Sequence, residues 1–335
     1  MDLQTLWFIL IAVLFIGFLF LEGFDYGVGI LLPIVAKQDN ERRVVVNTIG
    51  PIWDGNEVWL LTAGGAMFAA FPNWYATLFS GFYLALFLIL IALIIRGVAF
   101  EFRSKDVSPR WRSLWDRAIF IGSLIPALLW GVAFGNILRG VAIDVHMTYV
   151  GSFFDLLNPY ALVGGLVTLT LFILHGALFL ELKTDGVIQE RARNITRRMW
   201  LPVTILAVVF VVFSLFQTDI LTHINVINVL GLILAVGGLL GTGYFIFKAR
   251  YGRAFMGTGL TIVGIVALIF GTLFPRVMPS TLGFDLTIYN ASSSPYTLQV
   301  MSVIALTVVP IVLLYQAWTY WVFRKRLTAQ SHLEY

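Results

Sequence analysis

One stretch of the chain, residues 49–71, is apolar enough to cross a bilayer and yet contains Asp54, Asn56 and Glu57 well inside it. Even on a lenient insertion scale, an ionised carboxylate near the centre of a bilayer costs roughly 2.5 kcal/mol or more. Such residues therefore usually face the interior of a helix bundle or a water-filled path, where they mark proton or ion routes. The chain must therefore adopt a fold in which other membrane helices surround these acids and keep them away from lipid.

A second stretch, LEGFDYGVG in the first apolar segment, contains Glu22 and Asp25. These acids must also be kept away from lipid. In both stretches the two acids are three positions apart, which on a helix places them on one face. If the two segments form a tight hairpin, Asp25 and Asp54 reach a similar depth and the four carboxyl groups form one cluster. Buried like-charged acids cannot all ionise, so some must hold protons, as a proton relay requires.

Two other interpretations of these residues stay open. Asp54 and Asn56 could satisfy a backbone kink left by Gly50 and Pro51, or cap a helix that starts there. Four carboxylates on two helices could also bind a divalent metal, but the Glu-x-x-His spacing of di-iron bundles is absent from the sequence. We therefore expect no metal site.

The composition excludes a soluble protein. Of the 335 residues, 59% are hydrophobic and only 12% are charged, and the mean hydropathy is +0.89. The lack of cysteine excludes disulfides, thiolate metal sites and cysteine nucleophiles. The N-terminal segment lacks the basic start of a cleaved signal, so we interpret it as a membrane helix. The sequence predicts an all-α polytopic membrane protein, and it implies no nucleic-acid partner.

A membrane-spanning helix needs about 20 apolar residues, and on this basis the sequence predicts nine membrane spans. They are Leu6–Val35, Val45–Phe71, Trp74–Phe102, Leu114–Leu138, Pro159–Leu182, Met199–Gln217, Ile224–Phe247, Phe255–Phe274 and Leu298–Phe323. With these spans, 20 of the 22 Lys and Arg residues fall on one side of the membrane, and only Arg139 and Arg276 fall on the other. The positive-inside rule therefore places the N-terminus outside and the C-terminus in the cytoplasm.

The charged stretch Lys183 to Arg198 is the nearest thing to a linker. It predicts a first helical half, residues 1–182, that carries the carboxylates, and a second half, residues 183–335, within one integral membrane unit. The polar stretch Arg276 to Tyr296 is rich in Pro, Ser, Gly and Asn, and this composition predicts a long external loop.

Histidine and arginine are sparse inside the predicted spans. His175 is the one histidine of four that lies within a span, so this chain alone offers no pair of histidines for a haem iron. A lone intramembrane histidine is usually a hydrogen-bonded packing residue. Arg96 ends the apolar run of the third span, and the simplest expectation is that it reaches to the cytoplasmic interface. Pairing of Arg96 with a carboxylate of the cluster is the alternative.

Two tryptophans, Trp53 and Trp59, lie deep in the second span rather than at an interface. Their indole rings could pack against a flat lipid, a quinone or a cofactor of a partner. Ordinary packing within the bundle is the simpler expectation.

Several motifs in the first third of the chain resemble those of a known family. The two main ones are GFDYGVG and PIWDGNEVW, the second followed by LLTAGGAMFAAFP, and the flanking segments are NERR, SGFYLA and RGVAFEFRSK. On these residues the chain resembles subunit II of the cytochrome bd quinol oxidases, most densely over about its first 105 residues. The positions that match the family pattern are Asp25, Trp53, Asp54, Gly55, Asn56 and Trp59. The positions that depart from the pattern of proteobacterial members are Glu22, Ile52 and Glu57.

The resemblance implies a respiratory complex of the bacterial plasma membrane that oxidises quinol and reduces O2 to water. In this family a homologous subunit I carries two b-type haems and haem d, and a small single-span third subunit often accompanies the pair. The resemblance further implies two four-helix bundles plus one extra helix, with no haem iron ligand in this chain.

The roles implied for this chain are to stabilise the haem subunit and to carry part of a cytoplasmic proton path. Asp54 and Asp25 would transfer protons, with Glu57 and Glu22 as further members of the relay. Without the resemblance, a proton-coupled transporter would be the leading interpretation. A transporter predicts broken helices in both halves, yet the later spans contain no acid comparable to Asp25 or Asp54.

Overall fold

The computed structural model describes residues 2–328, 331 and 333, which are mostly helical. The helices are α1 (Leu3–Val35), α2 (Asp39–Ile49), α3 (Trp53–Ala70), α4 (Pro72–Gly81), α5 (Tyr83–Phe102), α6 (Pro109–Arg139), α7 (Pro159–Lys183), α8 (Gly186–Gln217), α9 (Val226–Phe247), α10 (Tyr251–Leu273) and α11 (Pro295–Val322). Two short strands, β1 (Arg276–Met278) and β2 (Leu286–Thr287), pair antiparallel.

Eight helices of the described residues, α1 and α5 to α11, are long and apolar enough to cross a membrane. Their positions follow the predicted spans because each contains a long run of apolar residues with few charges. The exception is α8, which begins at Gly186, so most of the charged stretch from Lys183 to Arg198 is helix and not the linker that the sequence suggested. The predicted class, an all-α polytopic membrane protein, is confirmed at this level.

The predicted second span, Val45–Phe71, is not one helix. α2 ends at Ile49 and α3 begins at Trp53, with Gly50, Pro51 and Ile52 between them. Proline lacks an N–H and its ring clashes with the preceding turn, so the helix ends where Pro51 enters. The predicted third span is likewise divided, into α4 and α5, at Phe82.

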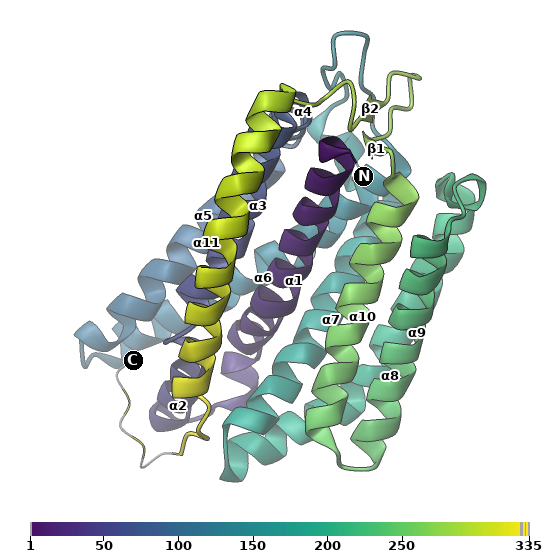
Figure 1. Ribbon diagram of the computed structural model, residues 1–335. Helices are drawn as coiled ribbons and strands as arrows, with labels where there is room; N and C mark the ends of the chain where they lie inside the picture. The colour runs from purple at the N-terminus through teal and green to yellow at the C-terminus, as the bar shows by residue number, and fades with distance from the viewer. Residues whose placement is uncertain (1, 329–330, 332, 334–335) are drawn as a thin grey trace.

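Helix α1 forms the centre of the bundle and packs against α3, α6, α7 and α10 (Figure 1). The approach of α1 to α7 is closest at Gly27, where an added Cβ would lie 1.9 Å from the backbone oxygen of Phe172. A residue with a side chain would therefore push the two helices apart. This central position explains why Glu22 and Asp25 are shielded by protein on every side.

The start of α1 and the β1–β2 hairpin lie at one end of the bundle, and the last turn of α11 lies at the opposite end (Figure 1). The stretch Arg276 to Tyr296 was predicted as a loop, and the structure adds the hairpin within it. The segment after α6 joins this hairpin, because the Val141 N–H donates to the Pro279 carbonyl at 3.1 Å. At the other end, Leu327 bridges to Thr184 beside the start of α8.

Candidate functional site

A cluster of ionisable side chains lies inside the bundle where α1, α3 and α5 meet. We call Glu22, Asp25, Asn56, Glu57 and Arg96 the acid cluster. All but Glu57 are completely buried, and 19% of the Glu57 side chain is exposed. The spacing of Glu22 and Asp25 on α1 places both on the face toward α3 and α5, as the sequence predicted.

Arg96 lies within this cluster and not at the cytoplasmic interface, so the simplest expectation from the sequence was wrong. Its Nη1 atom donates to Glu22 Oε2 at 2.9 Å and lies 3.8 Å from Glu57 Oε2. The guanidinium also lies over the ring of Tyr26, 4.9 Å from its centroid. Desolvating a guanidinium costs several kcal/mol, and the ion pair with Glu22 offsets that cost.

Several polar atoms of the acid cluster have no hydrogen-bond partner among the described residues. They are Glu22 Oε1, Asp25 Oδ1, Glu57 Oε2, Arg96 Nε and Arg96 Nη2. Most buried polar groups in proteins are hydrogen-bonded, and exceptions occur where a site has a chemical role. One guanidinium balances one negative charge, so it cannot balance three ionised carboxylates. The cluster therefore has both the acids and the unsatisfied oxygens that proton transfer needs.

Helix α11 completes the site through two residues that the sequence analysis did not single out. The Tyr320 hydroxyl donates to Asn56 Oδ1 at 2.7 Å, and Gln316 Nε2 donates to the same oxygen at 3.3 Å. Asn56 Nδ2 in turn donates to Asp25 Oδ2 at 2.7 Å. One sequence feature could have pointed to them: Gln316 and Tyr320 are polar and four positions apart in the last apolar span, so they share a face of its helix.

Asp54 lies apart from the buried acids, so the structure brings together three of the four predicted carboxyl groups. Asp54 is exposed on the surface of this chain and makes no hydrogen bond or ion pair with a described residue. It occupies the first turn of α3, where the helix dipole favours a negative charge. The N-cap position belongs to Ile52, so a side-chain cap by Asp54 is not formed. Asn56 does not act as a cap either, because its side chain bonds to Asp25.

Trp53 and Trp59 both pack within the chain. The ring of Trp53 lies 5.2 Å from that of Phe100. Trp59 lies against Gly17, and its indole N–H donates to Gln316 Oε1 at 2.8 Å. These contacts agree with the expectation that both tryptophans pack within the bundle.

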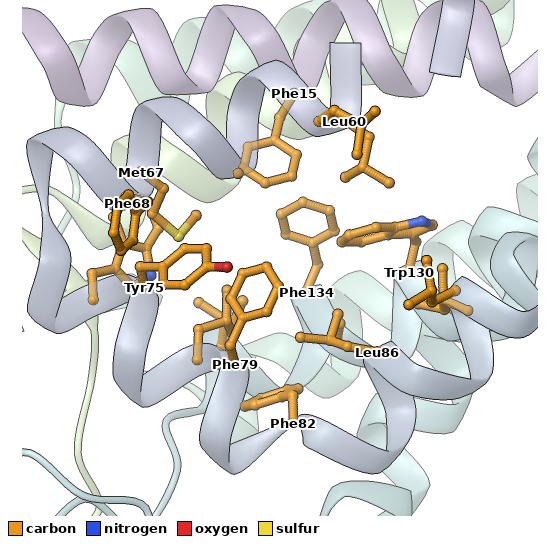
Figure 2. Close-up of a pocket in the computed structure, with 18 of the residues that line it drawn as sticks. Phe15, Leu60, Met67, Phe68, Tyr75, Phe79, Phe82, Leu86, Trp130 and Phe134 are labelled. Atoms are coloured by element: carbon orange, nitrogen blue, oxygen red, sulfur yellow. The ribbon is translucent and has the colours of Figure 1, made fainter. Parts of the chain in front are cut away.

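An apolar cavity of about 500 Å³ extends from Glu57 between α1, α3, α4, α5, α6 and α10. Aromatic rings gather around it, among them Phe15, Phe79 and Phe134 (Figure 2). The indole nitrogens of two other lining residues, Trp74 and Trp130, have no hydrogen-bond partner among the described residues. The cavity can hold an elongated apolar molecule.

His175 is completely buried between α7, α10 and α1. Its Nε2 atom lies 3.1 Å from the Phe20 carbonyl oxygen and its Nδ1 atom 2.7 Å from Thr258 Oγ1. A carbonyl only accepts, so in the neutral ring Nε2 carries the hydrogen and Nδ1 accepts from Thr258. The ring also stacks on Phe255 with 4.4 Å between centroids. These contacts support the packing interpretation, and they leave no ring nitrogen facing a haem iron.

The described residues contain no group of three or more His, Cys, Asp or Glu side chains that could hold a metal ion. Glu22 and Glu57 both approach the guanidinium of Arg96, which occupies the place that a cation would take. Neither a metal nor a haem iron therefore fits the residues of this site.

Comparison with known proteins shows similarity along the whole chain. The family described as cytochrome bd terminal oxidase subunit II matches residues 3–323. The chain is 46% identical to cytochrome bd ubiquinol oxidase subunit 2 of Bacillus subtilis, an alignment that covers 100% of this chain and 99% of the relative. It is 40% identical to cytochrome bd-I ubiquinol oxidase subunit 2 of Escherichia coli K12, with 98% and 96% of the two chains covered.

The fold is also similar to a solved structure. A chain of the bd oxidase from Geobacillus thermodenitrificans superposes with a TM-score of 0.79 at 17% sequence identity, covering 97% of this chain and 100% of that chain. At this level of identity the similarity concerns the fold alone.

Proposed function

The chain belongs to the cytochrome bd terminal oxidase subunit II family, and from this we propose that it is the haem-free second subunit of a quinol-oxidising, O2-reducing complex. It is a multi-pass protein of the bacterial membrane and a subunit of an oxidoreductase complex. In this proposal two b-type haems and haem d reside in the partner subunit I, and quinol is the substrate. A small third subunit completes the assembly. Family membership favours this function over a proton-coupled transporter.

The observation that carries the proposal is the placement of the acids on α1 and α3. Asp54 lies on the exposed side of α3, whereas Glu57, one turn further along the same helix, contacts the buried cluster of Glu22, Asp25 and Arg96. We take this as a route by which protons pass from the cytoplasmic end, through Asp54 and Glu57, to Asp25. The unpartnered oxygens of the cluster supply the positions at which a proton can bind.

The exposure of Asp54 supports a subunit contact on the same face of α3. A carboxylate that faces lipid within a bilayer is costly. The exposed residues on this face include Val58, Leu61 and Phe68, which are apolar, together with Gly55, which has open space beside it. We therefore place the haem-bearing subunit I on this face, where it shields Asp54 from lipid.

The proposed topology has nine crossings, with α3 as the ninth. Its 18 residues span about 27 Å at 1.5 Å per residue, close to the hydrocarbon thickness of about 30 Å. The start of α1 and the end of α11 lie at opposite ends of the bundle (Figure 1), and an odd number of crossings agrees with this arrangement. The predicted halves, residues 1–182 and 183–335, would then pack as one unit, since α10 contacts α1 and α7. Reporters fused after Lys105 and Arg193 should score cytoplasmic, and one near Ser293 external.

The cavity in Figure 2 supports a further element of the proposal, a bound quinone or lipid tail. Its aromatic lining suits an isoprenoid or acyl chain. Such contacts were the alternative to ordinary packing for Trp53 and Trp59, and neither of these residues lines the cavity.

The test of the proposed function combines purification with one substitution. The complex purified through this chain should show haem d absorbance in the red. Asp54→Asn preserves shape and hydrogen bonding but removes the titratable proton, so the variant should assemble with normal haem content and turn over more slowly. Asp54→Leu should disturb assembly as well. Full turnover of an assembled Asp54→Asn complex across a wide pH range would refute the proton path and leave this subunit as a scaffold.

A further inference from the structure

A row of hydrogen bonds runs from α3 to α11, back to α3 and then to α1. Trp59 Nε1 donates to Gln316 Oε1 at 2.8 Å, and Gln316 Nε2 donates to Asn56 Oδ1 at 3.3 Å. Asn56 Nδ2 then donates to Asp25 Oδ2 at 2.7 Å. The row links residues that are up to 291 positions apart, through helices that pack side by side.

The chemistry of Trp59 determines the direction of this row. The two ends of a carboxamide are nearly equal in shape, so an Asn or Gln side chain can point either way. An indole N–H can only donate, so Gln316 must present its oxygen to Trp59 and its nitrogen to Asn56. Asn56 must then receive on its oxygen and donate to Asp25. The Tyr320 hydroxyl donates to the same Asn56 oxygen at 2.7 Å and reinforces this orientation.

The orientation of Asn56 makes the two oxygens of Asp25 inequivalent. Oδ2 faces an N–H donor and therefore acts as an acceptor, so a proton placed on Oδ2 would oppose that donor. Oδ1 is buried and has no hydrogen-bond partner among the described residues. We propose that Trp59, Gln316 and Asn56 form a positioning chain that directs the transferable proton of Asp25 to Oδ1 and away from α11.

This inference rests on the proposed function, because it assumes that Asp25 carries a proton during turnover. Carboxamides do not titrate near neutral pH, so the positioning chain does not conduct protons. It occupies Oδ2 of Asp25 and leaves Oδ1 without a hydrogen bond from a described residue. Trp59, Gln316 and Tyr320 are thus positioning residues, and α11 orients the acid without belonging to the proton path.

The simplest rival is that these bonds only hold α11 against the bundle. The structure offers a matched control, because a second indole holds the other end of the same helix. Trp7 Nε1 donates to the Leu298 carbonyl at 3.2 Å and to Ser302 Oγ at 3.1 Å, and it has no link to Asp25. Trp7→Phe and Trp59→Phe each remove one indole N–H that anchors α11, but only Trp59→Phe releases the positioning chain.

The test uses the whole purified complex and infrared difference spectroscopy of protonated carboxyl groups. The C=O stretching band of Asp25 is the band that Asp25→Asn removes. Trp59→Phe should shift or broaden this band, and the double variant Trp59→Phe/Tyr320→Phe should do so more strongly, because Tyr320 alone still donates to Asn56. The double variant should also move the pH–rate profile of quinol oxidation to higher pH by about one unit, comparable to the loss of one hydrogen bond to a charged group.

The control variant and the two ways in which the proposal can fail give different results. Trp7→Phe should leave the band and the pH–rate profile unchanged, and the haem spectrum of each variant reports assembly. If Asp25→Asn removes the band but Trp59→Phe/Tyr320→Phe leaves the band and profile as in the native complex, the positioning chain is refuted while the proton path stands. If the native complex has no band that depends on Asp25, both are refuted.

Discussion

Helix α1 contributes to two buried polar sites on different faces, and the sites differ in how completely their polar atoms are bonded. At His175 both ring nitrogens have partners and the ring stacks on Phe255. In the acid cluster, carboxyl oxygens and guanidinium nitrogens remain without partners among the described residues. A fully satisfied polar site holds helices together, whereas a charged site with unsatisfied atoms is costly and needs a chemical reason.

The largest expected effect comes from removing the one cation of the acid cluster. Arg96→Leu leaves Glu22 buried without its 2.9 Å partner, and breaking a buried ion pair on one side typically costs about 3–5 kcal/mol. We expect loss of assembled complex or a large drop in its thermal unfolding temperature in detergent. The double variant Glu22→Leu/Arg96→Leu removes both charges and should be more stable than Arg96→Leu. If the double variant is no better, the pair does not stabilise the cluster.

The next effect concerns turnover and not stability. Asp25→Asn keeps a side chain that can bond to Asn56 but cannot carry the proton, so haem content should be normal. Loss of a proton-transferring group typically costs about 10²- to 10⁴-fold in rate, and a parallel route would reduce this to about tenfold. Oxygen consumption with quinol as donor measures it. Glu190→Gln, a change of an exposed acid on α8 outside the acid cluster, is the control and should turn over normally.

A smaller effect is expected at the satisfied site. His175→Phe keeps a ring that can stack on Phe255 but removes both hydrogen bonds, which are worth about 1 kcal/mol each. Thr258 retains a partner, since its hydroxyl lies 2.9 Å from the Phe255 carbonyl. Thermal unfolding should therefore show a loss of about 1–2 kcal/mol, with turnover and its pH dependence unchanged. A changed pH–rate profile would show that His175 has a chemical role after all.

The smallest effect is expected for an ion pair outside the membrane. Burial of the Asp39 carboxyl opposes ionisation, but hydrogen bonds and charges from Arg103 and Arg112 outweigh it and lower the pKa of Asp39. A lowered pKa in the folded state adds stability at neutral pH, and this is lost as the pH falls below about 4. Because Asp39 is partly exposed, Asp39→Asn should cost less than about 1 kcal/mol.

Unfolding of Asp39→Asn and the native complex should be compared at pH 7 and near pH 3.5. The difference between them should shrink at the lower pH, because the Asp39 carboxyl of the unfolded chain then takes up a proton more readily than that of the folded chain. If the difference in stability instead grows on acidification, the pKa of Asp39 is not lowered in the folded protein. The distinction between this weak exposed pair and the buried pair of Arg96 and Glu22 would then fail.

The predicted class and most helix positions follow from the sequence because hydrophobic runs and charge placement are local properties. Long apolar segments predicted eight of the helices, and Pro51 marked the break between α2 and α3. The i, i+3 spacing of Glu22 and Asp25 placed both on one face, since helical geometry relates near neighbours. The motifs around Asp25 and Asp54 were sufficient to identify the family.

Only the tertiary structure decided which partners these residues meet. Arg96 could reach an interface or a buried acid from the same helix, and the packing of α5 on the bundle selected the acid. Gln316 and Tyr320 join the site across more than 250 positions of sequence, a distance over which no local pattern carries information. The same packing leaves Asp54 outside the cluster that contains Asp25, because helical rotation places Asp54 and Asn56 on different sides of α3.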